Sequence, residues 1–482
     1  MHLLYSFLAG AATTLAFAPF GLHPLALLTS AVLVRLWMHA PPQRCALLGF
    51  AFAAGLFGAG VSWVYVSLHQ FGGMAAPLAA FATVVFCALL ALFPAAAGWL
   101  QARVPATDPA RACLLIPAAW VLSEWMLSWI FTGFPWLALG YSAAGWPLQG
   151  YAPLGGVYAV SFLIVSVGGM LWLLFGHKPR FLVVLVLVLG TGEALRHVAW
   201  TLPAGAPVPT ALLQGNIAQE VKFVPERAPR ILETYARLAE GTQARLVIFP
   251  ETALPAFLDR IDPAYLARLD AVGKRNEGDL LVGVPYRAGR DVYYNSAFSL
   301  GVSPRQIYHK VHLVPFGEFV PLGFRWTLDV LSIPLSDFSR GSPAQPPLDV
   351  GSQRVAVNIC YEDVFGAEIM RLLPEATLLV NMSNVAWFGD SLAPAQHLQI
   401  ARIRAIESGR MYLTATNTGI TAAIDRDGRV IARLQQFTEG RLEISAQGYS
   451  GATPYVRLRD WPVVLACLLI FTLLTVRAKR SR

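Results

Sequence analysis

The chain reads Val355-Ala356-Val357-Asn358-Ile359-Cys360-Tyr361-Glu362-Asp363 where an apolar run ends on a cysteine and continues into two carboxylates. The apolar run predicts a buried β-strand, and the glycine that follows shortly after predicts a turn. A thiol at the end of a strand, with charged neighbours in reach, is a candidate nucleophile. This stretch therefore predicts that Cys360 is catalytic.

Two upstream stretches carry the groups that such a thiol requires. Leu246-Val247-Ile248-Phe249-Pro250-Glu251 predicts a strand ending on a carboxylate, and Ile307-Tyr308-His309-Lys310 predicts one ending on a lysine. A cysteine attacks a carbonyl as its thiolate, and an ordinary pKa of about 8.5 leaves little thiolate at neutral pH. We expect Glu251 to take the thiol proton and Lys310 to stabilise the thiolate and the oxyanion.

Composition divides the chain into a membrane part and a soluble part. Of 482 residues, 55% are hydrophobic and only 14% are charged, which is too apolar for a wholly soluble protein. Residues 1–200 contain three acidic side chains, and nearly all remaining acidic residues lie between about 215 and 460. We predict a membrane domain at 1–200, a catalytic domain at 201–458, and a final helix with a basic cytoplasmic tail at 459–482.

Eight apolar segments predict eight transmembrane helices, because most of them approach the roughly 20 residues that cross a bilayer. Seven precede the soluble part and one follows it. They are 3–19, 24–40, 45–67, 74–99, 112–132, 157–176, 180–199 and Trp461 to Val476.

Basic residues alternate between the loops and predict the orientation, because Lys and Arg accumulate in cytoplasmic loops. Three loops carry them, and the loops between carry none. The basic residues are Arg44, Arg103, Arg111, Lys178 and Arg180. The N-terminus is therefore expected to be cytoplasmic, and residues 200–458 are expected to lie outside the cytoplasm.

The net charge of +8 does not indicate a nucleic-acid partner. Many of the basic groups lie in short loops beside apolar segments, and those of the soluble part are scattered among acids without a basic stripe. The five cysteines show neither disulfide nor metal spacing, and four lie in apolar segments. Cys360 is the only one in the soluble part, and no metal or cofactor is expected.

Short β-rich runs separated by helical patterns follow residue 207 and predict an α/β sandwich of two sheets. The predicted helices are 227–241, 263–275, 365–373 and 394–409. The predicted strands are Thr210–Gln214, Leu246–Pro250, Leu280–Val284, Tyr293–Leu300, Gln306–Lys310, Arg354–Cys360, Thr377–Met382, Met411–Thr416, Thr421–Asp425 and Val430–Arg433.

Three motifs together resemble the nitrilase superfamily. They are Phe249-Pro250-Glu251-Thr252, the run from Tyr308 to Glu318, and Asn358-Ile359-Cys360-Tyr361-Glu362. The resemblance covers about 207–445 and implies an αββα sandwich with a Glu-Lys-Cys triad in that chain order. It assigns catalytic roles to Glu251, Lys310 and Cys360, and supporting roles to Glu318, Tyr361 and Glu362.

The membrane segments narrow the resemblance to the apolipoprotein N-acyltransferase family. Further similar stretches are Gly133–Ser142, Gln214–Ile217, Asn381–Asp390 and Thr416–Ile420. The resemblance implies a multi-pass protein of the bacterial inner membrane with its catalytic domain on the periplasmic side. Cys360 would accept a fatty acyl chain from a membrane phospholipid as a thioester. It would then pass the chain to the α-amine of the diacylglyceryl-cysteine of an apolipoprotein, the final step of lipoprotein maturation.

Several features leave two interpretations open. The apolar run 316–338 is either core packing or a loop that admits lipid, and in the second case Phe316 and Trp326 line the access route together with Trp387. The aromatic loop 133–142 is either an interfacial belt or a floor beneath the site.

Two single residues also stand out. Glu124 lies within an apolar segment, where a carboxylate requires a partner that the sequence does not name. Phe223 follows Lys222 where family members can carry Trp, which leaves any polar role at that position in question.

Two other functions remain possible from the sequence. A membrane-anchored amidase could use the same triad with water as the second nucleophile, although eight spans exceed what an anchor requires. A transporter or lipoprotein-binding module could retain the sandwich as a scaffold, although a binding module has no use for an activated thiol.

Overall fold

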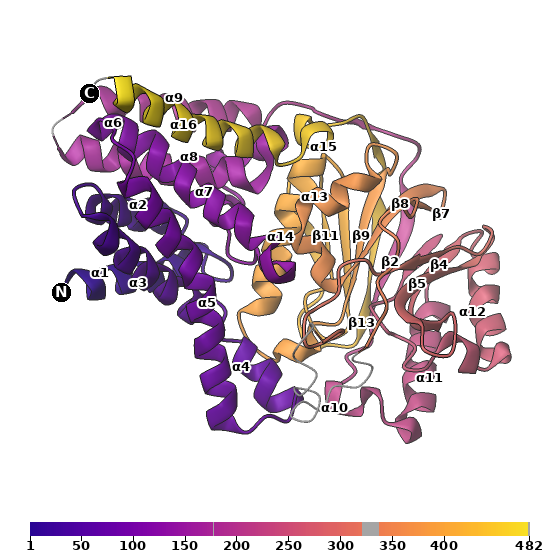
Figure 1. Ribbon diagram of the computed structural model, residues 1–482. Coiled ribbons are helices and arrows are strands. Elements are labelled where there is room, and N and C mark those ends of the chain that lie inside the picture. The colour runs from indigo at the N-terminus through magenta and orange to yellow at the C-terminus, as the bar shows by residue number, and fades with distance from the viewer. Residues whose placement is uncertain (177, 321–336, 481–482) are drawn as a thin grey trace.

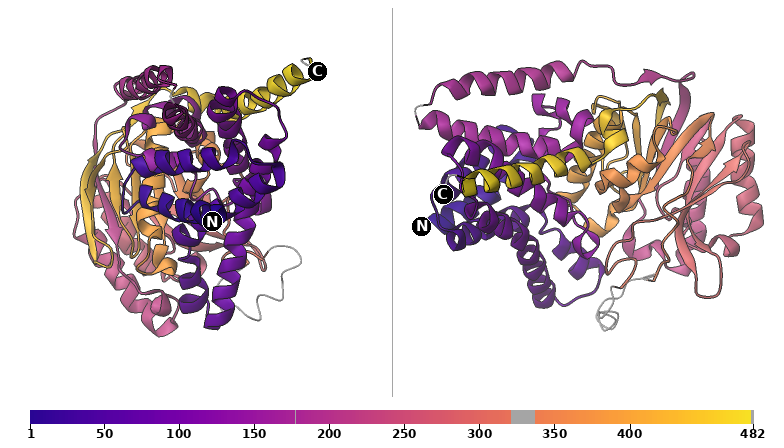
Figure 2. Two further views of the ribbon diagram at one scale, coloured as in Figure 1. Left: turned by 90° about the vertical axis from the view of Figure 1, so that its left-hand side faces the viewer. Right: turned by 45° about the horizontal axis from the view of Figure 1, so that its top comes forward.

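Helices form one side of the molecule and a two-sheet sandwich forms the other (Figure 1). The computed structural model describes residues 1–176, 178–320 and 337–480. The N-terminus and the end of the last helix both lie at the end of the helical part that points away from the sandwich (Figure 2).

All eight predicted apolar segments are helical. The helices are α1 (His2–Thr13), α2 (Pro24–Trp37), α3 (Pro42–Gly60), α5 (Ala76–Ala102), α7 (Ile116–Leu127), α8 (Ala152–Phe175), α9 (Arg180–Leu195) and α16 (Trp461–Arg480). Among the described residues, four stretches are long and apolar enough to cross a membrane: 42–60, 76–102, 108–127 and 147–175. The count of eight spans stays a prediction, because the other helices are shorter or less apolar.

The outer helices expose apolar side chains that a water-soluble protein would bury. On α5, Phe81 and Val84 are each 66% exposed, and Leu187 of α9 and Leu473 of α16 are similarly open. The inner faces pack into a continuous apolar core that includes Trp37, Phe52 and Trp120. This pattern is typical of helices that face lipid on one side and protein on the other.

Two six-stranded sheets form the sandwich, as predicted. One has the order β13-β2-β3-β4-β5-β6 and the other the order β12-β11-β10-β9-β8-β7. The first comprises β13 (Gly440–Ala446), β2 (Val208–Gln214), β3 (Leu246–Ile248), β4 (Asp279–Arg287), β5 (Tyr293–Gly301) and β6 (Ile307–His309). The second comprises β12 (Val430–Arg433), β11 (Ala422–Ile424), β10 (Tyr412–Thr416), β9 (Leu378–Ser383), β8 (Gln353–Ile359) and β7 (Leu348–Val350).

Helices cover the outer face of each sheet. On one side lie α11 (Ala228–Glu240) and α12 (Pro263–Arg275), and on the other lie α13 (Gly366–Ile369) and α14 (Ala393–Ser408). Strand β3 is buried on both faces, which explains why it is a continuous apolar run in the sequence. Strands β8 and β9 are also largely buried, although they contain polar residues such as Asn358 and Asn381. Strands β7 and β13 were not predicted; β13 alternates polar and apolar residues at the edge of its sheet.

The inner surface of α14 joins the sandwich to the helical part. Gln396 accepts hydrogen bonds from the indoles of Trp63, at 3.1 Å, and Trp136, at 2.8 Å, and donates one to the carbonyl of Gly60 at 3.0 Å. One turn further along, the side-chain oxygen of Gln399 accepts from the amide of Ala18 at 2.9 Å. Helix α14 therefore packs on one sheet of the sandwich and also hydrogen-bonds to three separate segments of the helical part.

Glu124 has the partners that the sequence could not name. Its Oε1 accepts from the indole of Trp120 at 2.7 Å and from the amide of Leu139 at 2.8 Å. The amide of Gly140 donates to the hydroxyl of Ser161 at 2.8 Å. These bonds fix the loop 133–142 to α7 and α8, on the side of the helical part that faces the sandwich.

We predict that Glu124→Leu lowers the thermal stability of the detergent-solubilised protein. The change leaves the buried N–H groups of Trp120 and Leu139 without an acceptor, at about 1–3 kcal/mol for each. Glu124→Gln retains the accepting oxygen and serves as the matched control. Equal unfolding temperatures for the two variants would show that these hydrogen bonds do not hold the loop.

Candidate active site

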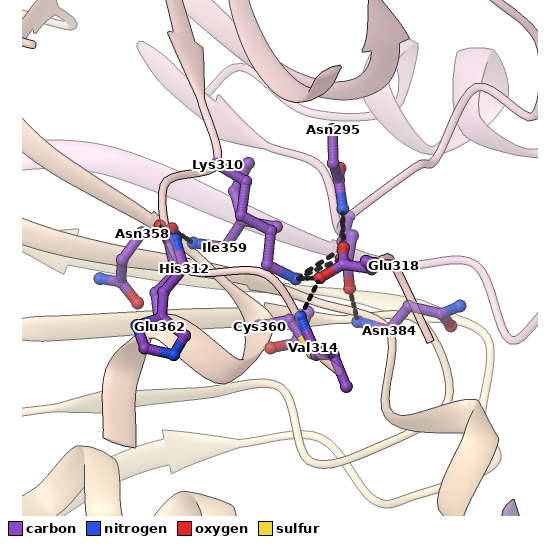
Figure 3. Close-up of polar contacts among 12 residues, drawn as sticks. Asn295, Lys310, His312, Val314, Glu318, Asn358, Ile359, Cys360, Glu362 and Asn384 are labelled. Atoms are coloured by element: carbon purple, nitrogen blue, oxygen red, sulfur yellow. Dashed lines mark hydrogen bonds and ion pairs between the residues drawn. The ribbon is translucent and has the colours of Figure 1, made fainter. Parts of the chain in front are cut away.

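The three predicted catalytic residues meet between the two sheets, each just beyond the end of a strand. Figure 3 shows Lys310 and Cys360 there. Glu251 follows β3 and Lys310 follows β6 in one sheet, while Cys360 follows β8 in the other. The strands end slightly earlier than predicted, so Cys360 begins the short 3-10 turn Cys360–Val364 instead of closing β8.

Cys360 adopts a left-handed backbone conformation, with φ of 53°. For a residue with a Cβ this costs on the order of 1–3 kcal/mol and persists only where the surroundings enforce it. The strand on one side and the 3-10 turn on the other provide that constraint, and the side-chain amide of Asn381 donates to the Cys360 carbonyl at 3.0 Å. The sharp turn presents the thiol to the groups of the opposite sheet.

Lys310 lies between two carboxylates and is 1% exposed. Its Nζ is 2.8 Å from Glu318 and 3.4 Å from Oε1 of Glu251. The side-chain amide of Asn295 donates to both carboxylates, at 2.7 Å to Glu251 and 2.9 Å to Glu318. Burial would lower the pKa of Lys310, but Glu318 and Glu251 hold it above its ordinary value, so the ammonium is charged.

Glu251 is hydrogen-bonded at both oxygens. Besides Asn295, the amide of Asn384 donates to its Oε2 at 2.8 Å, and Lys222 donates to its backbone carbonyl at 3.1 Å. Burial would raise the pKa of Glu251, but Lys310, Lys222 and these amides hold it below the ordinary value. Burial lowers the pKa of Lys222 to about 8, against the attraction of Glu251.

These charges keep the thiol protonated and the carboxylate ionised in the resting site. Burial, followed by the negative charge of Glu251, raises the pKa of Cys360, while Lys310 opposes the rise. Proton transfer from Cys360 to Glu251 is thus unfavourable until a substrate carbonyl lies in place to receive the sulfur. The arrangement can therefore form the Cys360 thiolate when a substrate carbonyl is present, with Lys310 beside the position where the negative charge of the oxyanion develops.

The two further predicted carboxylates have different surroundings. Glu318 belongs to the Lys310 cluster and also accepts from the amide of Val314 at 2.9 Å. Glu362 instead accepts from the hydroxyl of Tyr308 and from backbone amides at both strand ends, those of Val311, His312 and Ile359. Burial raises the pKa of Glu362 to about 7, against these hydrogen bonds. Glu362 thus ties the turn of Cys360 to the segment that carries Lys310.

Comparison with known proteins agrees with this geometry. Residues 9–170 match the family described as Apolipoprotein N-acyltransferase N-terminal domain, and residues 210–454 match Carbon-nitrogen hydrolase. An apolipoprotein N-acyltransferase of Nitrosomonas europaea is 49% identical over 95% of this chain and 93% of its own length. That of Methylococcus capsulatus is 43% identical over 99% of this chain and 97% of its own.

The chain belongs to the apolipoprotein N-acyltransferase family. It is an acyltransferase with a carbon-nitrogen hydrolase domain, and the amidase alternative is not favoured. Among solved structures, an amidase from Nesterenkonia covers 54% of this chain and 97% of its own at 18% identity, with a TM-score of 0.39. That similarity is too low to add to the assignment.

Tyr361 connects the acyltransferase site to the aromatic loop 133–142. Its hydroxyl donates to the carbonyl of Gly133 at 2.9 Å, and its ring stacks against Trp136 and Phe134, with centroids 6.3 and 6.4 Å apart. Trp136 in turn contacts Trp63 of the helical part at 5.0 Å. The loop 133–142 therefore packs against the turn Cys360–Val364, called the catalytic turn below. This contact favours the interpretation that the loop forms the floor of the site over the interpretation that it is an interfacial belt.

The residues predicted to line a lipid route are only partly described. Trp387 packs its ring on Phe71 at 6.2 Å, and its carbonyl accepts from Ser67, so it lies against the helical part. Phe316 has a left-handed φ of 62° and its amide donates to the carbonyl of Phe319 at 2.8 Å. Trp326 lies outside the described residues, within 321–336.

Sequence reasoning missed the roles of Asn295, Asn384 and Lys222 in this acyltransferase. Each contacts Glu251, yet none lies at a spacing that marks it beforehand. Asn295 occupies an inward position of β5 opposite β6, and its carbonyl accepts from the Lys310 amide at 2.8 Å. Strand β5 also contains Ser296 and Ser299, so the sequence carried no signal that distinguished Asn295.

We predict that Asn295→Asp is more damaging than Asn295→Ala. Alanine removes two donors, whereas aspartate places a third carboxylate against Glu251 and Glu318. The folded-state pKa of the new carboxyl should be raised, so the loss of stability should be greatest above that pKa and should fade towards about pH 4. Thermal unfolding as a function of pH measures this. If aspartate equals alanine across that range, the three side chains do not share a compact charge cluster.

Proposed function

We propose that this protein transfers a fatty acyl chain from a membrane phospholipid to the α-amine of the diacylglyceryl-cysteine of an apolipoprotein, through a thioester on Cys360. One observation carries the proposal. The half-buried thiol of Cys360 lies opposite Glu251 and Lys310, and the next residue, Tyr361, stacks on Trp136 of the aromatic loop 133–142. A phospholipid acyl donor from a bilayer suits a site in which catalytic side chains lie next to an apolar surface.

Acylation begins when the ester carbonyl of the phospholipid lies beside Cys360. The proton of Sγ passes to Glu251 while the sulfur attacks the carbonyl carbon, and Lys310 stabilises the oxyanion that forms. The ester C–O bond then breaks. Glu251 returns the proton to the departing glycerol oxygen, so that a lysophospholipid leaves and the thioester remains.

Transfer reverses these roles with an amine as the nucleophile. The neutral α-amine attacks the thioester carbonyl, Lys310 again stabilises the oxyanion, and Glu251 takes a proton from the nitrogen. Collapse breaks the C–S bond, and that proton returns to the sulfur. The products are an amide-linked third acyl chain and a restored Cys360 thiol.

The orientation of the molecule supports the same proposal. Both ends of the described chain lie on the side of the helical part away from the sandwich, as an even number of crossings requires. Together with the basic loops and the exposed apolar faces, this supports eight spans, an inner-membrane location and a catalytic domain, residues 201–458, on the periplasmic side. The membrane domain would then comprise 1–200, with the eighth span in 459–482.

We predict that incubation with phospholipid carrying a labelled acyl chain attaches label to Cys360 before any lipoprotein is added. The adduct should be sensitive to hydroxylamine, absent in Cys360→Ala, and discharged by a diacylated lipopeptide. Mass spectrometry of the Cys360 peptide measures it. Transfer of label to lipopeptide by Cys360→Ala would contradict a covalent mechanism, and discharge by water as fast as by lipopeptide would favour hydrolysis.

We predict that Glu251→Gln slows acylation by roughly two to four orders of magnitude, the range typical of general acid-base catalysis. Glutamine keeps an oxygen for one of the two donors, Asn295 or Asn384, but cannot take the thiol proton. Single-turnover labelling measures the rate, with Glu233→Gln on an exposed pair with Arg268 as the control. Near-normal acylation in Glu251→Gln would transfer the role of base to Glu318.

A further inference from the structure

A buried histidine-carboxylate pair lies next to the catalytic turn and has no part in the mechanism above. His397 of α14 is 5% exposed, and its Nε2 is 2.8 Å from Oδ1 of Asp363, three residues after the nucleophile. Asp363 is 1% exposed, and its second oxygen has no hydrogen-bond partner within the described chain. A buried carboxylate with a single partner depends strongly on the charge of that partner.

The same imidazole contacts the floor of the site. Its ring is parallel to that of Trp136, with an interplanar angle of 6° and centroids 5.7 Å apart. Trp136 is held by the neighbouring residue of α14, because its indole donates to Gln396 at 2.8 Å. A charged imidazole gains from such stacking, because an indole face is electronegative.

The imidazole also lies near the nucleophile's own backbone. The carbonyl of Cys360, which accepts from Asn381 at 3.0 Å, contributes to raising the pKa of His397. That peptide is the one held in the left-handed conformation. His397 thus joins three parts of the site: the backbone of Cys360, Asp363 of its turn, and Trp136 of the floor.

The charged groups around the pair come from several elements. Burial would lower the pKa of His397, but Asp363, the Cys360 carbonyl and Glu251 hold it above the ordinary value. Arg404 and Glu407, further along α14, pair with each other. Tyr412 of β10 and Tyr141 of the loop 133–142 also lie near Asp363.

We propose that His397, as an imidazolium paired with Asp363 and stacked on Trp136, is a positioning residue that holds the catalytic turn, so that the reactivity of Cys360 depends on a protonated histidine. This inference rests on the proposed role of Cys360 as the acyl acceptor. A charge-assisted hydrogen bond is shorter and stronger than a neutral one, so the protonated ring holds Asp363, and with it the turn that begins at Cys360, more firmly. Its charge also lowers the energy of the thiolate that forms during attack.

As pH rises, loss of the His397 proton should weaken both the hold on the catalytic turn and the stabilisation of the Cys360 thiolate. The carboxylate of Asp363 keeps the proton on the ring to higher pH, so reactivity should decline only above the raised pKa of His397. Lys222, with a pKa of about 8, also loses its charge in this range. A variant that changes the histidine alone is therefore required to separate the two.

The test measures the pH profile of Cys360 in wild type, Asp363→Asn and His397→Gln, from about pH 5 to 9, a range that brackets histidine titration. Two readouts run in parallel: acylation by labelled phospholipid, and alkylation of Cys360 by iodoacetamide. Alkylation is quantified by mass spectrometry and divided by the roughly tenfold rise per pH unit that ionisation of a protonated thiol produces by itself. Asp363→Asn should move the alkaline decline to lower pH. His397→Gln retains a donor without a titrating charge, so it should remove that decline and react at least about tenfold more slowly below it.

His197→Gln is the matched control, because His197 pairs with Glu193 but is 76% exposed and remote from the site. Its profile should equal that of wild type. Thermal unfolding identifies any variant that reacts slowly because it is misfolded. If Asp363→Asn and His397→Gln both reproduce the wild-type profile and rate, the proposal is wrong. If alkylation shows the predicted changes but phospholipid never acylates wild type, the positioning role stands and the proposed function fails.

Discussion

The site depends on the burial of one ammonium group. Lys310 lies between Glu251 and Glu318 in the interior of the sandwich, where an unpaired charge would cost several kcal/mol. The surrounding residues stabilise this buried charge cluster. Asn295 donates to both carboxylates, and the Asn384 amide donates to the second oxygen of Glu251. Lys222 supplies a second cation. Two carboxylates and two ammonium groups balance, which leaves the thiol of Cys360 neutral until a substrate arrives.

The second constraint is the joint between the sandwich and the helical bundle. Helix α14 packs on the β8–β12 side of the sandwich and also binds the chain at Ala18, Gly60 and Trp136. At its far end, Arg404 binds Tyr141, and Glu407 accepts from the amide of Val157 at 2.7 Å. These buried polar contacts fix the catalytic turn above the aromatic floor. An acyltransferase that draws on a bilayer requires that its nucleophile be held at a defined position relative to the apolar part.

Much of the architecture could be predicted because it depends on local pattern. The short apolar run Leu246–Ile248 is typical of a buried strand, and apolar stretches of membrane length are typical of helices in an apolar setting. Edge strands were harder. β7 is only three residues long, which gives little pattern to detect. β13 alternates polar and apolar residues, a strand pattern that the prediction missed.

The sequence by itself determined the two-part organisation, the helices, most strands and the Glu251, Lys310 and Cys360 set, because these follow from hydrophobic periodicity and from motifs of adjacent residues. Only the tertiary structure decided which polar side chains share a site. Asn295 reaches Glu251 through strand pairing, and His397 meets Asp363 and Trp136 from three distant segments. Such contacts depend on register and on the docking of α14, and they leave no periodic trace, because a buried polar residue is recognised by its partners and not by its neighbours in sequence.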